Sequence, residues 1–431
     1  MEKFIKIIYV SLAIVFLISL SGCNEDSVGE AWEEVAANDP EWQGEYYLRN
    51  GGKPLPLLPN AEFAFNLLKN IAVEENGANL FISPISANIA LSILTNGAGG
   101  QTLTESKSAL GYGDLSVTEM NEYLSGVQST PLPSDKDDPV VDFAGGIWFD
   151  HTLPLKPGFT EAIKTYYQAE PENVVFADLA TFEAINKWTS DKTRGRIPRI
   201  VEFSQDMVGC IVNTLYFNGK WATPFRPEMT ASEAFINADG TKTSTPTMQS
   251  RQITFVYRGT SFSMLELCYA AALSVSDKRP NYSMMLILPN DNVPLSSVLD
   301  ALTPEAFNIV QSKMALYDAT VKLPKFTVSY GSELTDILAG LGMPTMFSSP
   351  DLSALSEKSF VLSGLKVIQK AFASIDENGT EATSATAVSM FTESAGTSYP
   401  HVNFFVNRPF LFFIQENNTG QILFSGKIEK L

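Results

Sequence analysis

The chain has 431 residues, of which 45% are hydrophobic and 11% aromatic, so it can bury a large core and has the composition of a globular protein. Its formal net charge of −18 argues against nucleic-acid binding, because phosphate groups require a basic face. The charge favours instead a soluble surface that repels other copies, and we expect a monomer.

The first 22 residues have the pattern of a secretion signal. Lys3 and Lys6 precede an apolar run over residues 7–20, which is shorter than the about 20 apolar residues that a membrane-spanning helix needs. The run ends in Leu20-Ser21-Gly22-Cys23, which resembles the lipobox of bacterial lipoproteins, where the cysteine thiol takes the lipid. The alternative is an ordinary cleaved signal with an incidental cysteine. The resemblance implies that Cys23 becomes the lipidated first residue, anchored to a membrane that the chain does not span.

An acidic stretch follows Cys23. Residues 24–45 contain eight acidic and no basic residues, which is typical of a solvated tether. Acidic residues directly after a lipidated cysteine also resemble the surface-export signals of Bacteroidetes lipoproteins. We therefore expect a lipid-anchored protein of the bacterial cell envelope, in the outer membrane and on its extracellular side, with residues 23–59 as the tether. Four aromatic residues leave open that part of the tether docks on the body: Trp32, Trp42, Tyr46 and Tyr47.

The first half of the body is mainly helical. Apolar residues at helical spacing predict helices over residues 61–75 and 84–96, and Ser83-Pro84 supplies an N-cap and a first-turn proline for the second helix. Shorter elements follow, of which the third is a strand and the others are helices: 103–110, 120–127, 140–149, 159–167 and 181–193.

The second half, after Arg199, contains long β-rich runs that predict strands. The strands are expected at residues 207–217, 233–237, 252–258, 261–274, 282–288, 319–329, 361–375, 402–415 and 421–428. Helices are expected between them at residues 295–301, 304–314 and 333–340. Because residues 60–431 contain no internal repeat and no linker rich in proline, glycine or serine, we expect one large α+β domain.

The sequence lacks the usual motifs of metal binding and nucleophilic catalysis. No CxxC, HExxH, GxSxG or GxxxxGK[ST] string occurs, and we expect no metal and no cofactor. Cys210 and Cys268 lie in apolar strand-like runs, which favours buried thiols over a disulfide or a metal pair. With only His151 and His401 in the chain, a histidine-dependent catalytic triad has few candidates, and an enzyme is the least favoured function.

The stretch from Ser374 to Tyr399 combines two patterns. Gly379 and the small, polar residues after it are typical of an exposed loop. Yet residues 380–391 also alternate like a strand, with Glu381 on the solvent side, and the stretch contains no proline, so every amide could join a ladder. The side predicted to face inward is small at first and then apolar: Thr380, Ala382, Ser384, Thr386, Val388 and Met390. The segment is therefore a candidate switch between loop and strand.

Five ordered segments of the chain resemble the serpin family, over residues 60–431. They are NLFISPIS from Asn79, NTLYFNGKW from Asn213, LPKF from Leu323, DENGTEA from Asp376 and FFVNRPFLFFI from Phe404. The resemblance implies the serpin fold, with three β-sheets, eight to nine helices and an exposed reactive-centre loop at about residues 377–399. It also implies a mechanism in which a protease cleaves the loop, forms an acyl-enzyme and is trapped when the loop inserts into the main sheet. A non-inhibitory serpin, acting as protease substrate, bait or binding module, is the alternative.

The resemblance assigns roles to three groups of residues. The hinge, which inserts first, comprises Glu377, Gly379, Thr380, Ala382, Ser384, Ala385 and Thr386. The shutter, a polar cluster beneath the point where the sheet opens, comprises Ser83, Ser86, Asn213 and Gln369. Gln369 stands where the family usually has histidine, and its amide can donate and accept hydrogen bonds but cannot titrate. The breach, at the top of the sheet, comprises Trp221 and Lys325, and Lys325 is expected to pair with Glu377.

The position of the scissile bond stays open in the sequence. Counting forward from Glu377 places it between Glu393 and Ser394, whereas counting backward from Asn407 leads to Ser398, and Thr392 after Phe391 is a further candidate. Because residues 375–407 contain no lysine or arginine, trypsin-like targets are disfavoured. The expected partners are elastase-, subtilisin- or chymotrypsin-like serine proteases, with glutamyl-specific enzymes and papain-like cysteine proteases as further classes.

Overall fold

The computed structural model describes residues 48–129, 138–169, 171–204, 207–269, 280–357, 365–381 and 399–431. Cys23 and all four scissile-bond candidates lie outside these residues, as do the hinge positions 382–386. Within the described ranges, no helix is long and apolar enough to cross a membrane.

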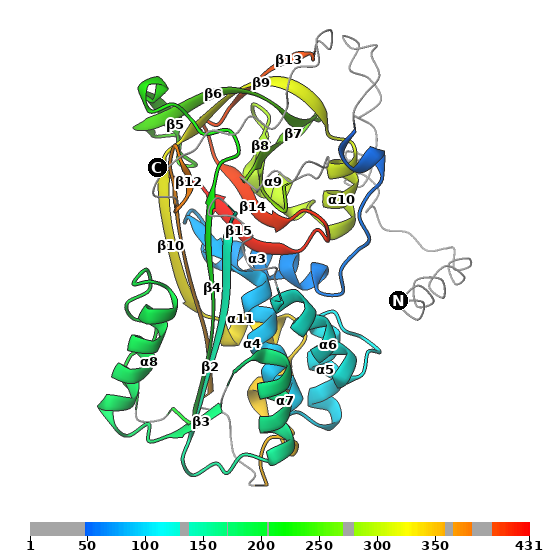
Figure 1. The fold of residues 1–431 in the computed structure, drawn as a ribbon, viewed down its shortest axis with the longest axis vertical. Helices are drawn as coiled ribbons and strands as arrows, with labels where there is room; N and C mark the ends of the chain where they lie inside the picture. The colour runs from blue at the N-terminus through cyan, green and yellow to red at the C-terminus, as the bar shows by residue number, and fades with distance from the viewer. Residues whose placement is uncertain are drawn as a thin grey trace, which may run out of the picture.

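A six-stranded sheet runs along the long axis of the molecule (Figure 1). Its strands, in spatial order, are β10 (Phe326–Glu333), β11 (Leu365–Ile375), β12 (Gly379–Thr380), β4 (Gly209–Lys220), β2 (Val140–Asp150) and β3 (Pro171–Val174). The two-residue strand β12 is the beginning of the stretch predicted to switch between loop and strand.

A second, nine-stranded sheet contains most of the aromatic core. Its strands, in spatial order, are β1 (Leu80–Ile82), β15 (Ile422–Ile428), β14 (Phe410–Glu416), β8 (Tyr282–Pro289), β7 (Phe262–Cys268), β6 (Lys242–Arg258), β9 (Ala315–Pro324) and β13 (His401–Phe405), and β5 (Ala231–Ile236) pairs with β6. The family resemblance implied three sheets, but the strands in the described residues form two. The long strand β6 pairs with β5 near its start and with β7 near its end, and so joins strands on both sides into a single sheet.

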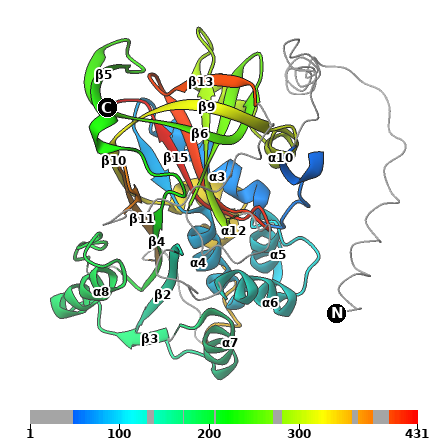
Figure 2. The same ribbon diagram turned by 45° about the horizontal axis from the view of Figure 1, so that its top comes forward.

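Helices cover both faces of the six-stranded sheet (Figures 1 and 2). Ten α-helices occur in the described ranges, rather than the expected eight or nine: α3 (Ala61–Glu74), α4 (Pro84–Asn96), α5 (Gly100–Ala109), α6 (Val117–Gln128), α7 (Pro157–Tyr167), α8 (Leu179–Lys192), α9 (Leu295–Asp300), α10 (Pro304–Ser312), α11 (Thr335–Gly340) and α12 (Pro344–Ser348). Helix α4 is buried from Pro84 to Thr95, and Ser83 caps it as predicted, accepting a hydrogen bond from the Ser86 amide. Helix α8 lies apart from the others, on the opposite face of the sheet, over Trp148, Cys210 and Val212.

The α+β fold class is confirmed, and the differences from the predicted elements have local causes. The predicted strand 319–329 is two strands, β9 and β10, which join different sheets on either side of Lys325. The predicted strand 402–415 is likewise broken at Pro409, which has no amide to donate to a ladder. Strands β1 and β3 are too short to show an alternating pattern.

The end of the predicted tether packs against the body. Residues 49–52 form a short 3-10 turn, and the Arg49 amide donates to the Met314 carbonyl. The Arg49 side chain is fully buried, with Nε 3.4 Å from Glu266 Oε2 and Nη2 3.4 Å from Asn417 Oδ1. Glu266 is also fully buried and accepts a hydrogen bond of 2.6 Å from Ser283 Oγ. Residues that follow the acidic stretch are thus fixed to the core by a buried charge pair.

Candidate functional site at the sheet opening

Strands β11 and β4 are in contact at one end and apart at the other. At the lower end in Figure 1, residues 365–368 pair directly with residues 209–212, in parallel. At the upper end β12 lies between the two strands, antiparallel to both, with Thr380 opposite Ile375 of β11 and Gly219 of β4. We call the diverging part the sheet opening, which comprises residues 369–374 of β11 and 213–218 of β4.

The start of the hinge already occupies the top of the opening. Thr380 is 2% exposed, and its Oγ1 lies 2.7 Å from the hydroxyl of Tyr269, whose ring stacks on Trp221. The predicted inward orientation of Thr380 is therefore confirmed. Gly379 has no room for a side chain, because a Cβ there would lie 2.0 Å from the Gly219 carbonyl oxygen. Only glycine fits at this point of strand entry.

The breach residues hold the segment that precedes the hinge. The indole of Trp221 donates to the Asp376 carbonyl at 2.9 Å, and its amide donates to the Asn378 carbonyl at 2.8 Å. Lys325 Nζ lies 2.7 Å from Glu377 Oε2, so the predicted pairing is present. Burial alone would raise the pKa of the Glu377 carboxyl, but hydrogen bonds from Lys325 and from Thr230 Oγ1 hold it below its usual value.

A Glu377→Gln variant is expected to lose stability in a pH-dependent way. Because the folded pKa of Glu377 is lowered, its stabilising effect is full above the unfolded pKa of about 4.3 and disappears as the pH falls through the folded value. Because the variant lacks the charged acceptor of these hydrogen bonds, we expect its free energy of unfolding at pH 7 to be about 1–2 kcal/mol lower than that of the wild type. Urea unfolding of both proteins between pH 7 and pH 3 measures this. A difference that does not shrink in acid would contradict the assignment.

Glu381 does not face solvent, contrary to the prediction. It contacts Arg196 of the segment after α8, whereas Thr380 contacts Tyr269, and it is only 8% exposed. Its Oε2 lies 3.4 Å from Arg196 Nε, and burial raises the pKa of its carboxyl while Arg196 opposes the rise. Its φ of 57° is left-handed, which costs a non-glycine residue about 1 kcal/mol.

The four shutter residues are buried, and two of them, Gln369 of β11 and Asn213 of β4, lie at the lower end of the opening. Ser83 Oγ donates to the Leu423 carbonyl at 2.8 Å, and the Gln369 amide donates to the Ser83 carbonyl at 2.6 Å. Three of their buried oxygens have no hydrogen-bond partner among the described residues: Ser86 Oγ, Asn213 Oδ1 and Gln369 Oε1. Each unpaired buried oxygen costs about 1–3 kcal/mol, and two of the three belong to Asn213 and Gln369, at the lower end of the opening.

The family model for serpins, described as serine protease inhibitors, matches residues 59–431. The chain belongs to the serpin family. Serpins are inhibitors of proteases and not enzymes.

Relatives and solved structures agree with this assignment. Serpin-Z2A of Triticum aestivum is 33% identical over 87% of this chain and 96% of its own length. Neuroserpin of Gallus gallus is 30% identical over 85% of this chain and 90% of its own length. The native-state structure of the thermophilic serpin tengpin superposes with a TM-score of 0.76 at 28% identity, covering 86% of this chain and 93% of that one. Thyroxine-binding globulin in complex with thyroxine gives a TM-score of 0.75 at 25% identity, covering 86% of this chain and 98% of that one.

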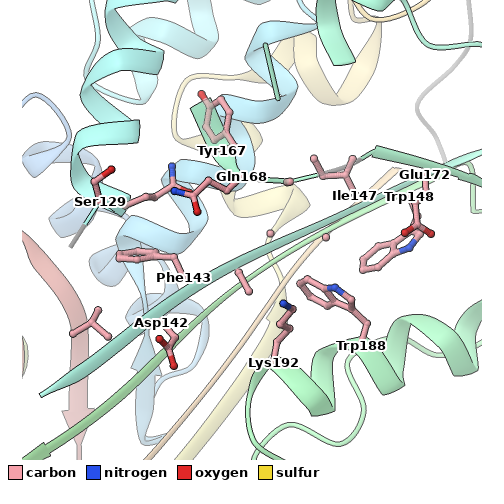
Figure 3. Close-up of a pocket in the computed structure, with 16 residues that line it drawn as sticks. Ser129, Asp142, Phe143, Ile147, Trp148, Tyr167, Gln168, Glu172, Trp188 and Lys192 are labelled. Carbon is pink, nitrogen blue, oxygen red and sulfur yellow. The ribbon is translucent and has the colours of Figure 1, made fainter. Parts of the chain in front are cut away.

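A cavity of about 550 Å³ lies beside the serpin's main sheet, around strand β2 (Figure 3). Figure 3 shows Phe143 on one side of β2 and Asp142 on the other, near Lys192 and Trp188 of α8. The Trp188 ring meets that of Trp148 edge-to-face at 5.3 Å. Gln128 of α6 and Tyr167 of α7 also line the cavity.

Sequence reasoning missed four residues that contact the hinge. Tyr269 and Thr230 bond to Thr380 and Glu377, Asn218 Nδ2 donates to the Glu381 carbonyl, and Arg196 pairs with the Glu381 carboxylate. Only Asn218 stands in a stretch that resembles the family, directly before Gly219 and Lys220, and could have been found there. The others belong to segments that no local pattern connects with the loop.

Proposed function

We propose that this serpin is a suicide inhibitor of serine endopeptidases, working through loop cleavage, acyl-enzyme trapping and loop insertion. The observation that carries the proposal is that Gly379 and Thr380 are already a strand between β11 and β4. The loop's far end is fixed elsewhere, because β13 pairs with β9 of the other sheet. Cutting the chain between these two anchors would free residues from 381 onward to continue the strand that β12 begins.

The register of β12 supports continued insertion. In antiparallel pairing, one step forward along a strand corresponds to one step backward along each neighbouring strand. Six residues after Thr380, Thr386 would therefore lie opposite both Asn213 and Gln369. It would face inward like Thr380, toward the unpaired Asn213 Oδ1 and Gln369 Oε1, and its hydroxyl could donate to one of them. Insertion would thus satisfy an oxygen that the closed sheet leaves unmet.

A Thr386→Val variant is expected to insert more slowly after cleavage, because valine has no hydroxyl to donate to either oxygen. We expect a several-fold higher stoichiometry of inhibition and a lower melting temperature of the cleaved form. Thr383→Val, on the outward face by alternation, is the matched control and should behave like the wild type. Equal effects of the two substitutions would contradict the register.

In the covalent step, the protease serine attacks the scissile carbonyl carbon, an ester forms, and the peptide bond breaks with its nitrogen leaving as the new amino terminus. The N-terminal part of the loop, still esterified, would then enter the sheet. Thr392, Glu393, Ser394 and Ser398 remain the candidates for the cut. Elastase-, subtilisin- and chymotrypsin-like enzymes are the proposed targets, with papain-like cysteine proteases as a further class.

Incubation with an elastase-like or subtilisin-like enzyme should give an SDS-resistant band at the summed mass of serpin and protease. Mass spectrometry of the released C-terminal fragment would then identify the cleaved bond. Only cleaved serpin, across a broad panel of proteases, would overturn the proposal.

The second candidate function is a non-inhibitory serpin that binds a ligand or serves as protease bait. The structural likeness to thyroxine-binding globulin, which was solved in complex with thyroxine, favours keeping this alternative. Loop cleavage separates the two functions. An inserting loop should raise the melting temperature strongly, whereas a loop that stays outside would leave it almost unchanged.

We also propose that the serpin is lipid-anchored through Cys23 at the bacterial outer membrane, on the extracellular side. The support is the Leu20-Ser21-Gly22-Cys23 sequence and the acidic stretch after it. A Cys23→Ala variant expressed in a bacterial host should lose incorporation of labelled fatty acid and leave the membrane fraction. Retention of both by the variant would refute the anchor.

A further inference from the structure

A second cavity, of about 600 Å³, lies between helix α6 and one end of the nine-stranded sheet. The helix contributes Tyr123 and Val127, and the sheet contributes Tyr282 at the start of β8 and Leu423 of β15. In Figure 1, α6 lies below the hairpin that joins β14 to β15. The volume is in the range of small-molecule sites, which measure about 300–1,000 Å³. Among the described residues that line this cavity, none belongs to the hinge, the shutter or the breach, so the cavity is separate from the sheet opening.

The cavity walls are mainly apolar, and their buried polar groups already bond within the protein. The Tyr123 hydroxyl lies 3.1 Å from Asn60 Oδ1 and 3.2 Å from Gln421 Oε1. Gln421 Nε2 in turn donates to the Ile422 carbonyl at 3.1 Å. A ligand would therefore gain affinity mainly by moving an apolar surface out of water, and only a part of it that reaches the charged rim would need a polar group.

The charged side chains that line the cavity are both carboxylates, those of Glu122 and Glu416. No lysine, arginine or histidine occurs among the described lining residues. Glu122 of α6 is exposed and has no ion-pair partner in the part of the chain that the structure describes. Glu416 is fixed by the hairpin, because its Oε1 accepts from the Asn418 amide at 3.0 Å and its Oε2 from the Thr419 amide at 2.8 Å. These amides are neutral, so they position the carboxylate without cancelling its charge.

We propose that this cavity binds a small cationic amphiphile, that is, an apolar aromatic body that carries a protonated amine. The body would pack between Val127 and Leu423, where the rings of Tyr123 and Tyr282 offer aromatic contacts. The ammonium group would be attracted by the two carboxylates. A ligand with a carboxylate would instead bring a third like charge to the site, which lowers its affinity.

Three probes of similar size test the proposal on the full chain: naphthylethylamine, naphthylethanol and naphthylacetic acid. Isothermal titration calorimetry measures each dissociation constant. Because single charge interactions at exposed positions change affinity by about five-fold at most, we expect the amine to bind about five-fold tighter than the alcohol. The acid should bind about five-fold weaker than the alcohol. The preference for the amine should shrink between about 20 mM and 500 mM sodium chloride, because salt screens exposed charges.

Three variants locate the binding. Glu122→Gln should weaken amine binding about three-fold and leave alcohol binding unchanged, because it removes one of the two attracting charges. Glu161→Gln is the matched control, because Glu161 is exposed on the neighbouring helix α7 and does not line the cavity. Its affinity for the amine should equal that of the wild type. Val127→Trp should fill the cavity and abolish binding of the amine and the alcohol alike.

Every outcome bears on the site or on its charge preference. Equal affinity for the amine and the alcohol, or an acid that binds as tightly as the amine, would overturn the cationic assignment. Unchanged amine binding by Val127→Trp, or no binding of any probe to the wild type, would overturn the site itself. Glu122→Gln changes an exposed residue and keeps the test valid if the tryptophan prevents folding. Protease trapping, assayed separately, bears only on the proposed inhibitory function.

Discussion

A Thr380→Arg variant is expected to be cleaved as a substrate instead of trapping its protease. Thr380 is 2% exposed, and its hydroxyl meets Tyr269 beneath the stacked Trp221 ring. An arginine there would have to bury an unpaired guanidinium at the top of the sheet, which costs several kcal/mol. The strand would be expelled at its first inward residue, before the rest of the loop could follow.

The measurement is the fraction of protease captured in an SDS-resistant complex, which should fall at least ten-fold while loop cleavage continues. Thr380→Ser keeps a hydroxyl near Tyr269 and is the matched control, expected to trap protease like the wild type. Undiminished complex from Thr380→Arg would count against the inward position of this residue during insertion.

An Arg49→Ala variant is expected to lose about 3–5 kcal/mol of stability, because it removes a guanidinium that lies 3.4 Å from the carboxylate of the fully buried Glu266. The same substitution removes the side chain that fixes residues 48–52 to the core, so this segment should become accessible to proteases. The midpoint of urea unfolding measures the first effect, and limited proteolysis followed by mass spectrometry measures the second.

Two controls sharpen this experiment. Lys53→Ala removes an exposed charge from the same segment and should leave the midpoint unchanged. The double variant Arg49→Met/Glu266→Met replaces both charges with apolar groups and should recover much of the loss, because no buried charge is then left unpaired. An Arg49→Ala variant as stable as the wild type would show that Glu266 does not depend on this arginine.

Much of the site followed from local sequence patterns and from the five motifs. Ser83-Pro84 predicted the start of α4, and alternation predicted that Thr380 faces the core. The pairing of Lys325 with Glu377 came from the family resemblance alone, because 51 residues separate the two in the chain and no periodicity connects them.

The sequence by itself determined the α+β class, most helices and the inward position of Thr380, because helical and strand periods depend on neighbouring residues. Only the tertiary structure decided what covers each face. Alternation places Glu381 opposite Thr380, but whether that face meets water depends on a loop almost 190 residues earlier in the chain. The same holds for Arg49, whose burial depends on Glu266 and Asn417, and for the unpaired oxygens at the opening, where segments distant in sequence meet.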